Sequence, residues 1–221
     1  MNSHSSDQSL KRKQQTQTGS NDQPNKKQIK INEFELKSLN KGCMLSDAVI
    51  NSCLQHFYNE FDRANIGFVN TFFYCKLERD GPAAASQWIS CSSIDTYSHF
   101  LIPIDLHAHW FLIDLDFNYH YINIYDSLRN APRRSKVVIK DKMTVRHPNV
   151  PKQFNDVDCG AFLLRYAYCI FRFQKVDRTF FNSQSIQTFR KNIYQSLREY
   201  SIDKSSDNDV EEIDGVDVVE I

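Results

Sequence analysis

The 221-residue chain lacks several features that define other classes of protein. It has only six glycines and no glycine-rich phosphate loop, so nothing in it supports nucleotide-dependent chemistry. No apolar run approaches the roughly 20 residues that a membrane-crossing helix needs. The N-terminal stretch MNSHSSDQSLKRKQQ also lacks the apolar segment of a secretory signal. We therefore expect a soluble intracellular protein with no membrane contact.

The chain also has no excess of one charge, since 27 Lys and Arg residues balance 27 Asp and Glu residues. This balance excludes the broad basic surface that generic nucleic-acid binding requires, so we expect no nucleic-acid partner. Charge is concentrated at the two ends. Residues 1–31 hold six basic residues against two acids, and residues 201–221 hold one Lys against eight acids.

Close cysteine pairs are absent as well. Six cysteines occur with no two closer than ten residues: Cys43, Cys53, Cys75, Cys91, Cys159 and Cys169. This spacing provides no zinc knuckle or ribbon, and a cysteine in a reducing compartment is usually a small buried apolar residue. We expect no metal and no cofactor, and we interpret Cys169, which lies inside an apolar run, as structural.

Composition divides the chain into three parts. Residues 1–31 are rich in Gln, Ser, Asn and Lys and predict a disordered basic arm, because they cannot bury enough apolar surface to offset chain entropy. Residues 32–200 carry the recurring apolar positions of one folded domain, which we expect to be a monomer. Residues 201–221 predict a disordered acidic tail.

Two basic clusters lie in the N-terminal arm. Lys11-Arg12-Lys13 and Lys26-Lys27 have the spacing of a two-part nuclear import signal. The alternative is a merely solvated tail, since such clusters are common in disordered segments. We expect the nucleus as the location, with the cytoplasm as a further one.

Apolar spacing predicts three helices in the folded domain. Ser46 is a suitable N-cap for the first helix, in which Ile50, Leu54, Phe57 and Phe61 form one buried stripe. The apolar run from Ala161 to Phe173 is too long for one strand and predicts a buried helix. A final helix, capped by Asn182 or Ser183, places Ile186, Phe189, Ile193 and Leu197 on one face.

Strands are predicted between these helices. The aromatic segment Phe68–Leu77 and the segment Phe100–Ile104 have the residue types of strands, with a loop at Asp80-Gly81-Pro82 and a short helix over Ser86–Ser93. Trp110–Leu115 and Tyr121–Tyr125 predict a β-hairpin about a turn at residues 116–119. Because strands and helices are interspersed, the fold class is α+β.

The hairpin places a histidine near a carboxylate. If its strands pair about that turn, His109 lies directly opposite Asp126, with the two Cβ atoms about 4.5–5.5 Å apart. A carboxylate at this distance holds an imidazole in one tautomer and helps it carry a positive charge, as a general base requires. A register slip of one residue would put the two groups on opposite faces.

A cysteine occupies the start of the predicted buried helix. Cys159 follows Asp158, a natural N-cap, and the positive end of the helix dipole favours a thiolate in the first turn. Gly160 leaves room beside the sulfur for a substrate carbonyl. Gln153, six residues earlier, offers an amide that could stabilise an oxyanion together with the Cys159 N–H. Each of these residues taken alone is usually structural, so the prediction of catalysis depends on their joint pattern.

Five motifs in order resemble those of the Ulp/sentrin-specific cysteine proteases, a family that cleaves after the Gly-Gly C-terminus of SUMO and related ubiquitin-like modifiers. The resemblance covers about residues 33–198. The motifs are LNKGCMLSDAVIN at 39–51, NTFFYCKL at 70–77, IPIDLHAHWFLIDLD at 102–116, INIYDSL at 122–128 and PKQFNDVDCGAFLLRYA at 151–167.

This resemblance implies a role for each matching residue. Cys159 is the implied nucleophile, His109 the base, Asp126 its orienting carboxylate and Gln153 the oxyanion donor. Trp110 is implied to cover a narrow channel that admits only the Gly-Gly tail. The implied fold is the papain-like α+β fold of the family, with a central mixed sheet and the cysteine at the N-terminus of a core helix.

Two departures from the family pattern affect substrate binding. Met44 stands where the family usually has a tryptophan that forms the other channel wall, and Ser46 replaces an asparagine. The segment 129–150 is shorter than the family's helix-bearing stretch, so a surface helix is expected to be reduced to a loop. We therefore assign Met44 to substrate binding and expect a weakened contact there.

Other functions stay open at the level of sequence. The modifier could be a Rub-type protein or ubiquitin instead of SUMO, or the chain could be a SUMO-binding module with weak or lost catalysis. His107 and His109 could form part of a metal site, but no third ligand is evident. Val216-Asp217-Val218-Val219 resembles a SUMO-interacting motif, which adds a strand to the edge of SUMO.

Overall fold

The computed structural model describes residues 31–86, 94–128, 143–176 and 183–203. Its elements, in chain order, are α1 (Glu33–Leu36), η1 (Lys37–Leu39), α2 (Asp47–Phe61), β1 (Ile66–Phe68), α3 (Phe72–Ser86), η2 (Ile94–Thr96), β2 (His99–Asp105), β3 (Trp110–Asp116), β4 (Tyr121–Tyr125), β5 (Thr144–Arg146), α4 (Cys159–Phe173) and α5 (Ser183–Asp203). The predictions for residues 1–30 and 204–221, for most of the short helix over Ser86–Ser93 and for most of the segment 129–150 fall outside the described residues, while α5 runs three residues into the predicted acidic tail.

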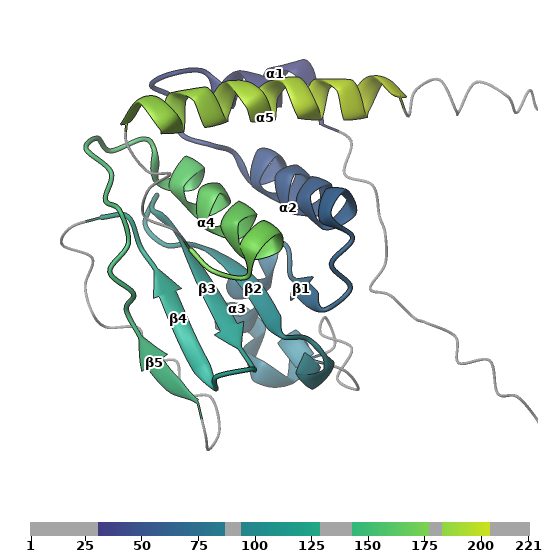
Figure 1. The fold of residues 1–221 in the computed structure, drawn as a ribbon, viewed down its shortest axis with the longest axis vertical. Helices are drawn as coiled ribbons and strands as arrows, with labels where there is room; N and C mark the ends of the chain where they lie inside the picture. The colour runs from purple at the N-terminus through teal and green to yellow at the C-terminus, as the bar shows by residue number, and fades with distance from the viewer. Residues whose placement is uncertain (1–30, 87–93, 129–142, 177–182, 204–221) are drawn as a thin grey trace, which may run out of the picture.

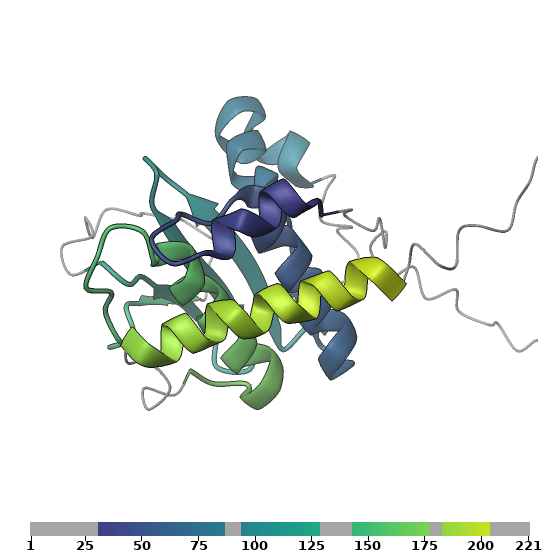
Figure 2. The ribbon, with the colours of Figure 1, turned by 90° about the horizontal axis from the view of Figure 1, so that it is seen from above.

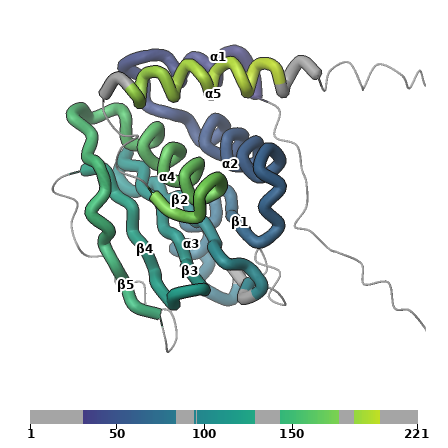
Figure 3. The backbone as a smooth tube through the Cα atoms, in the orientation of Figure 1, coloured from purple at the N-terminus to yellow at the C-terminus, as the bar shows by residue number. Residues whose placement is uncertain are grey.

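The five strands form one mixed sheet in the order β1-β2-β3-β4-β5 (Figure 1). The central pairs β2–β3 and β3–β4 are antiparallel, and the two outer pairs, β1–β2 and β4–β5, are parallel. The predicted α+β class with a mixed sheet is confirmed. Figure 3 shows the path of the chain, with α4 in front of β3.

Helices cover both faces of this sheet. On one face, α2, α4 and α5 pack in a single apolar cluster against Leu101, Trp110, Leu112 and Tyr125 of the sheet. On the other face, α3 packs through Phe73, Tyr74 and Leu77 against the remaining strand residues. Seen from above, α1 and α5 lie together over the first of these layers (Figure 2). No described helix is both long and apolar enough to cross a membrane.

The three predicted helices are confirmed. Ser46 caps α2, and its Oγ accepts a hydrogen bond from the Val49 N–H at 3.4 Å. The run from Ala161 to Phe173 lies within α4, which begins two residues earlier, at Cys159. The predicted stripe of α5 is buried: Ile186, Phe189, Ile193 and Leu197 are each at most 5% exposed.

The strand predicted at Phe68–Leu77 is wrong. Strand β1 ends at Phe68, and α3 begins at Phe72. Between them, Asn51 of α2 bonds the Thr71 N–H and hydroxyl, and Asn70 accepts hydrogen bonds from the N–H groups of Phe72 and Phe73. The buried residues of α3 have helical spacing, so tertiary packing overrides the strand preference of the aromatic side chains. The predicted break at Gly81 is present, because its φ of 78° kinks this helix.

The hairpin β3–β4 forms, but its register differs from the predicted one by two residues. Asp116 pairs with Tyr121, because the turn comprises residues 117–120 and not 116–119. Asp116 accepts a hydrogen bond from the Tyr119 N–H at 3.2 Å, and His120 closes the turn with a φ of 58°. A shift of two residues preserves the face of every side chain, so His109 and Asp126 become diagonal neighbours on the same face.

Candidate active site

Three elements bring the predicted triad together. His109 immediately precedes β3, Asp126 immediately follows β4, and Cys159 is the first residue of α4. His109 Nε2 lies 2.8 Å from Asp126 Oδ1, and the Cys159 side chain lies close enough to the His109 ring to raise its pKa. Since Nε2 faces the carboxylate, the other ring nitrogen, Nδ1, is the one available to the sulfur.

A tight turn fixes the position of His109. Leu106 and His109 exchange backbone hydrogen bonds of 3.0 and 3.1 Å around His107 and Ala108, which have φ values of 54° and 61°. Two positive φ values define a type I′ hairpin, which is costly for residues other than glycine and asparagine. His107 is exposed in this turn. Among the described residues, no group of three or more His, Cys, Asp or Glu could hold a metal ion.

The carboxylate of Asp126 is also fixed. Its Oδ1 accepts a second hydrogen bond from the Leu128 N–H at 2.9 Å. The ammonium of Lys152 donates to the backbone carbonyls of Asp126 and Leu128 at 2.6 and 3.3 Å. Asp126 therefore holds the imidazole in one orientation, the role that the sequence predicts for it.

The environment of His109 favours its charged form. Burial lowers the pKa of His109, but hydrogen bonds and charges from Asp126 and Cys159 outweigh this effect and raise the pKa to about 9. The imidazole therefore carries its proton at neutral pH. A protonated imidazole next to a cysteine sulfur is the arrangement of a thiolate–imidazolium nucleophile.

The nucleophile position is deeply buried, since Cys159 is 1% exposed. Asp158 occupies the N-cap position of α4 as predicted, but its side chain makes no capping hydrogen bond. Asp158 instead accepts hydrogen bonds from Arg190 and from Asn155. The capping interpretation of its side chain was wrong because a buried guanidinium competes for the same oxygen atoms.

Gln153 is held next to the triad by hydrogen bonds at both ends of its amide. The Ser127 hydroxyl donates to Gln153 Oε1 at 2.5 Å, and Gln153 Nε2 donates to the Asn155 carbonyl at 2.5 Å. An amide NH₂ has two donors, so one hydrogen stays available for an oxyanion. Sequence reasoning did not predict Ser127 or Asn155 as supports for this side chain.

The space beside Gly160 is filled by a protein side chain, unlike the prediction. A Cβ at Gly160 would lie 2.9 Å from Leu45 Cβ, so the missing side chain accommodates Leu45 and does not leave space for substrate. The Leu45 carbonyl in turn accepts a hydrogen bond from Trp110 Nε1 at 3.2 Å. Close packing therefore connects Trp110, Leu45 and the first turn of α4.

The two predicted substrate-binding residues lie in different environments. Trp110 is 3% exposed, and Met44, next to Leu45, is 38% exposed. Their roles as walls of a channel stay predictions. The described pockets lie elsewhere, between η1 and α5 and beside β4, so neither includes the triad.

Arg190 of α5 is a site residue that sequence reasoning missed. Its guanidinium is 1% exposed and bonds the Asp158 carboxylate and the carbonyls of Ser38, Cys43 and Val157. A signal was present, because Arg190 falls on the same stripe of α5 as Ile186 and Ile193. A charged residue on a buried stripe requires a buried partner.

Residues 44–204 match the family described as the Ulp1 protease family, C-terminal catalytic domain. The chain belongs to this family, as the resemblance predicts. Among curated relatives, it is 32% identical to sentrin-specific protease 3 of Mus musculus over 149 residues, which cover 60% of this chain and 26% of that protein. It is 28% identical to sentrin-specific protease 5 of Homo sapiens over 182 residues, covering 75% and 24% respectively. The chain thus spans about a quarter of the length of these relatives.

Solved structures confirm the fold. The SUMO protease Ulp1 with its catalytic cysteine oxidised to a sulfinic acid has a TM-score of 0.67 and 23% identity, covering 80% of this chain and 88% of that one. The Ulp1 protease domain in complex with Smt3, the yeast ortholog of SUMO, has a TM-score of 0.64 and 23% identity, covering 76% and 83%.

Proposed function

We propose that this chain is a cysteine protease that cleaves after the C-terminal Gly-Gly of SUMO. The observation that carries the proposal is the contact of one imidazole with both Asp126 and Cys159, in a chain that belongs to the Ulp1 protease family. An intact triad with a charged imidazole is the arrangement of an enzyme and argues against a purely binding module.

The geometry supports a two-step acyl transfer. The Cys159 sulfur attacks the scissile carbonyl, and the bond from that carbonyl carbon to the leaving nitrogen breaks as His109 gives the nitrogen a proton. The negative oxygen of the tetrahedral intermediate lies between the Cys159 N–H and the free amide hydrogen of Gln153. Water, deprotonated by His109, then hydrolyses the thioester and regenerates the sulfur. No metal or organic cofactor takes part in these steps.

Burial of the nucleophile supports a substrate whose C-terminal segment is narrow. Cys159 is 1% exposed, and the next residue, Gly160, packs closely against Leu45, so a chain reaching Cys159 must be extended and must carry small side chains. A Gly-Gly terminus meets both conditions. The relatives named sentrin-specific proteases, and the Ulp1 domain captured with a SUMO ortholog, support SUMO as the modifier.

The direct test is cleavage of a SUMO precursor by the purified chain, followed on a gel. Wild type should produce mature SUMO, and Cys159→Ser should lose about 10³-fold or more of this activity while still binding SUMO. Cys75→Ser, which removes an exposed thiol of α3, is the matched control and should cleave normally. Undiminished cleavage by Cys159→Ser would refute the proposed nucleophile.

A panel of modifier probes identifies the substrate. SUMO, a Rub-type protein and ubiquitin, each carrying a C-terminal vinyl sulfone, would be offered to the protein at equal concentration. The proposal expects adduct formation at Cys159 with the SUMO probe. Preferential labelling by the Rub-type or ubiquitin probe would reassign the modifier, and absence of labelling by all three would favour a binding module.

We also propose a nuclear location from Lys11-Arg12-Lys13 and Lys26-Lys27, which lie outside the described residues. Fusion of residues 1–31 to a fluorescent protein, with and without Ala substitutions in both clusters, tests this proposal. Nuclear accumulation that the substitutions abolish is the expected result, and equal distribution of both fusions would contradict it.

A further inference from the structure

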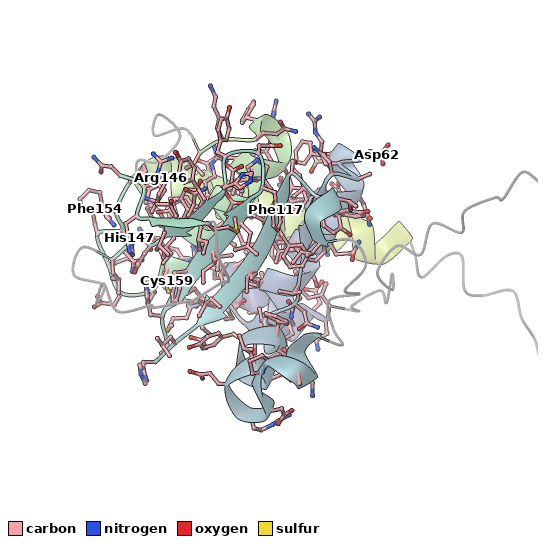
Figure 4. The ribbon with its side chains drawn as sticks, turned by 90° about the horizontal axis from the view of Figure 1, so that it is seen from below. Asp62, Phe117, Arg146, His147, Phe154 and Cys159 are labelled. Carbon is pink, nitrogen blue, oxygen red and sulfur yellow. The ribbon has the colours of Figure 1, made fainter. Side chains whose placement is uncertain are left out.

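An exposed aromatic side chain lies in the loop between the oxyanion donor and the nucleophile. Phe154 directly follows Gln153, is five residues before Cys159, and is 75% exposed. In Figure 4 the labels of Phe154 and His147 stand on the same side of the molecule as Cys159, whereas Asp62 lies on the opposite side. An apolar side chain this exposed next to a reacting group is available for contact with a bound protein.

The loop that carries Phe154 is held in one conformation. Asn155 Oδ1 accepts hydrogen bonds from the N–H groups of Val157 and Asp158, and Asn155 Nδ2 donates to the Asp158 carboxylate. Gln153 is 5% exposed and Phe154 is 75% exposed, so the two neighbouring side chains point in different directions. Phe154 is therefore presented on a fixed support, and little ordering is needed before it makes a contact.

The position of Phe154 favours the amine side of the scissile bond. In the proposed function the acyl side, which ends in the modifier tail, reaches Cys159 past Trp110, the predicted channel wall, whose indole N–H bonds the Leu45 carbonyl. The group attached through nitrogen then leaves on the other side of the scissile bond. The loop of residues 153–158 leads directly into Cys159 and is exposed at residues 154–156, so its side chains can meet the protein from which the modifier is removed.

We propose that Phe154 is a specificity-determining residue that contacts an apolar side chain next to the modified lysine of the target protein. This inference rests on the proposed function and assigns to the same site a preference for the leaving group. The preference adds to recognition of the modifier, since contact with the target is made only when the leaving group is a polypeptide of suitable sequence.

The test compares three substrates that share the same modifier. In the first, SUMO ends in aminomethylcoumarin, which is too small to reach the loop. In the other two, SUMO is joined to the lysine of a peptide that carries either leucine or glycine beside that lysine. Initial rates give kcat/KM for wild type, Phe154→Ala and Phe154→Leu on each substrate.

Wild type should favour the leucine peptide, and Phe154→Ala should lose about tenfold in kcat/KM on it, the size expected for one apolar contact. The same variant should keep its rate on the coumarin substrate within about twofold, and Phe154→Leu should recover part of the preference. Phe173→Ala is the matched control. It truncates another exposed phenylalanine at the far end of α4, about 21 Å along the helix from Cys159 at 1.5 Å per residue. This variant should change none of the rates.

The outcomes separate this inference from the proposed function. One outcome is that wild type cleaves all three substrates while Phe154→Ala loses the same factor in kcat/KM on each. Phe154 then contacts the modifier or supports the fold, and the inference is overturned. Unchanged rates for Phe154→Ala on every substrate overturn it as well. If wild type cleaves none of the three, the proposed function is overturned, and this inference is overturned with it.

Discussion

The Arg190 guanidinium holds the Asp158 carboxylate through two nitrogens, Nη2 at 2.7 Å and Nε at 3.0 Å, and Asp158 directly precedes the candidate nucleophile. The same guanidinium bonds the carbonyls of Ser38 and Cys43, which lie before α2. One side chain of α5 thus connects the N-terminal segment, the catalytic loop and the start of α4. The pair is buried at the N-terminus of α4, with Asp158 directly before Cys159 in the chain.

Removal of this guanidinium should destabilise the protein strongly. Arg190→Met leaves Asp158 buried and unpaired, which costs about 3–5 kcal/mol of unfolding free energy. Urea denaturation followed by circular dichroism measures this loss. Lys191→Met, at the exposed neighbouring position of α5, is the matched control and should stay within about 0.5 kcal/mol of wild type. The double variant Arg190→Met with Asp158→Asn removes the unpaired charge and should recover part of the lost stability. A small effect of Arg190→Met alone would show that the pair is not important for folding.

The charge state of the catalytic imidazole should depend on Asp126. In wild type the hydrogen bonds of His109 to Asp126 and Cys159 raise its pKa to about 9, so the imidazolium persists from neutral pH to about pH 9. Asp126→Asn removes the negative charge and should lower the pKa of His109. The rate of Cys159 alkylation by iodoacetamide, measured against pH, reports this loss of the ion pair.

The alkaline inflection in the pH profile of Cys159 alkylation should move to lower pH in Asp126→Asn. The kcat for SUMO cleavage by this variant should fall at every pH. Asp62→Asn is the control, because Asp62 is exposed and has a left-handed backbone that asparagine adopts easily. An unchanged alkaline inflection in Asp126→Asn would show that Asp126 does not set the charge of His109.

A second buried histidine pair should make stability depend on pH. His99 Nδ1 lies 3.0 Å from Asp114 Oδ1, and both side chains are buried. Burial lowers the pKa of His99, but the hydrogen bond and charge of Asp114, with the charge of Asp116, outweigh this effect and raise it. The folded state therefore binds this proton more tightly than the unfolded state.

The resulting stabilisation is fully present below the unfolded pKa of about 6.5 and is lost as the pH rises through the higher folded pKa. The unfolding free energy of wild type should therefore fall more steeply above pH 6.5 than that of His99→Gln. The contributions of other titrating groups to the unfolding free energy cancel when the two proteins are compared. Parallel curves, measured by denaturation from pH 6 upward, would contradict the assignment.

Sequence patterns predicted the elements in which the secondary structure favoured by the residues is also the one that tertiary packing requires. The stripes of α2 and α5 and the apolar run of α4 fixed three helices, because each pattern has only one periodicity that buries it. The strand predicted at Phe68–Leu77 failed because aromatic residues suit strands and buried helices equally well. Two contacts mark the start of α3: the Thr71 N–H donates to Asn51, from a distant part of the chain, and the Phe72 N–H donates to Asn70.

The triad could be predicted and its supports could not. His109, Asp126 and Cys159 are recognisable because their residue types occur in a family order. A two-residue error in the hairpin register left His109 and Asp126 on one face of the sheet. Arg190 and Ser127 act through contacts between segments that no local pattern relates. The sequence predicted a capping role for the Asp158 side chain because it cannot show that the Arg190 guanidinium of α5 binds this carboxylate.

The Ser127–Gln153 contact leads to a prediction about catalysis alone. Ser127 is 1% exposed, and its hydroxyl donates to Gln153 Oε1, which fixes the direction of the amide that we propose as the oxyanion donor. Gln153→Ala removes the donor and should lower kcat about 10²–10³-fold. Ser127→Ala keeps the donor but frees its orientation, so kcat should fall by a smaller factor while KM for SUMO stays the same. Because both variants weaken the same interaction, the double variant should be no slower than Gln153→Ala, and multiplied losses would show that Ser127 acts independently of Gln153.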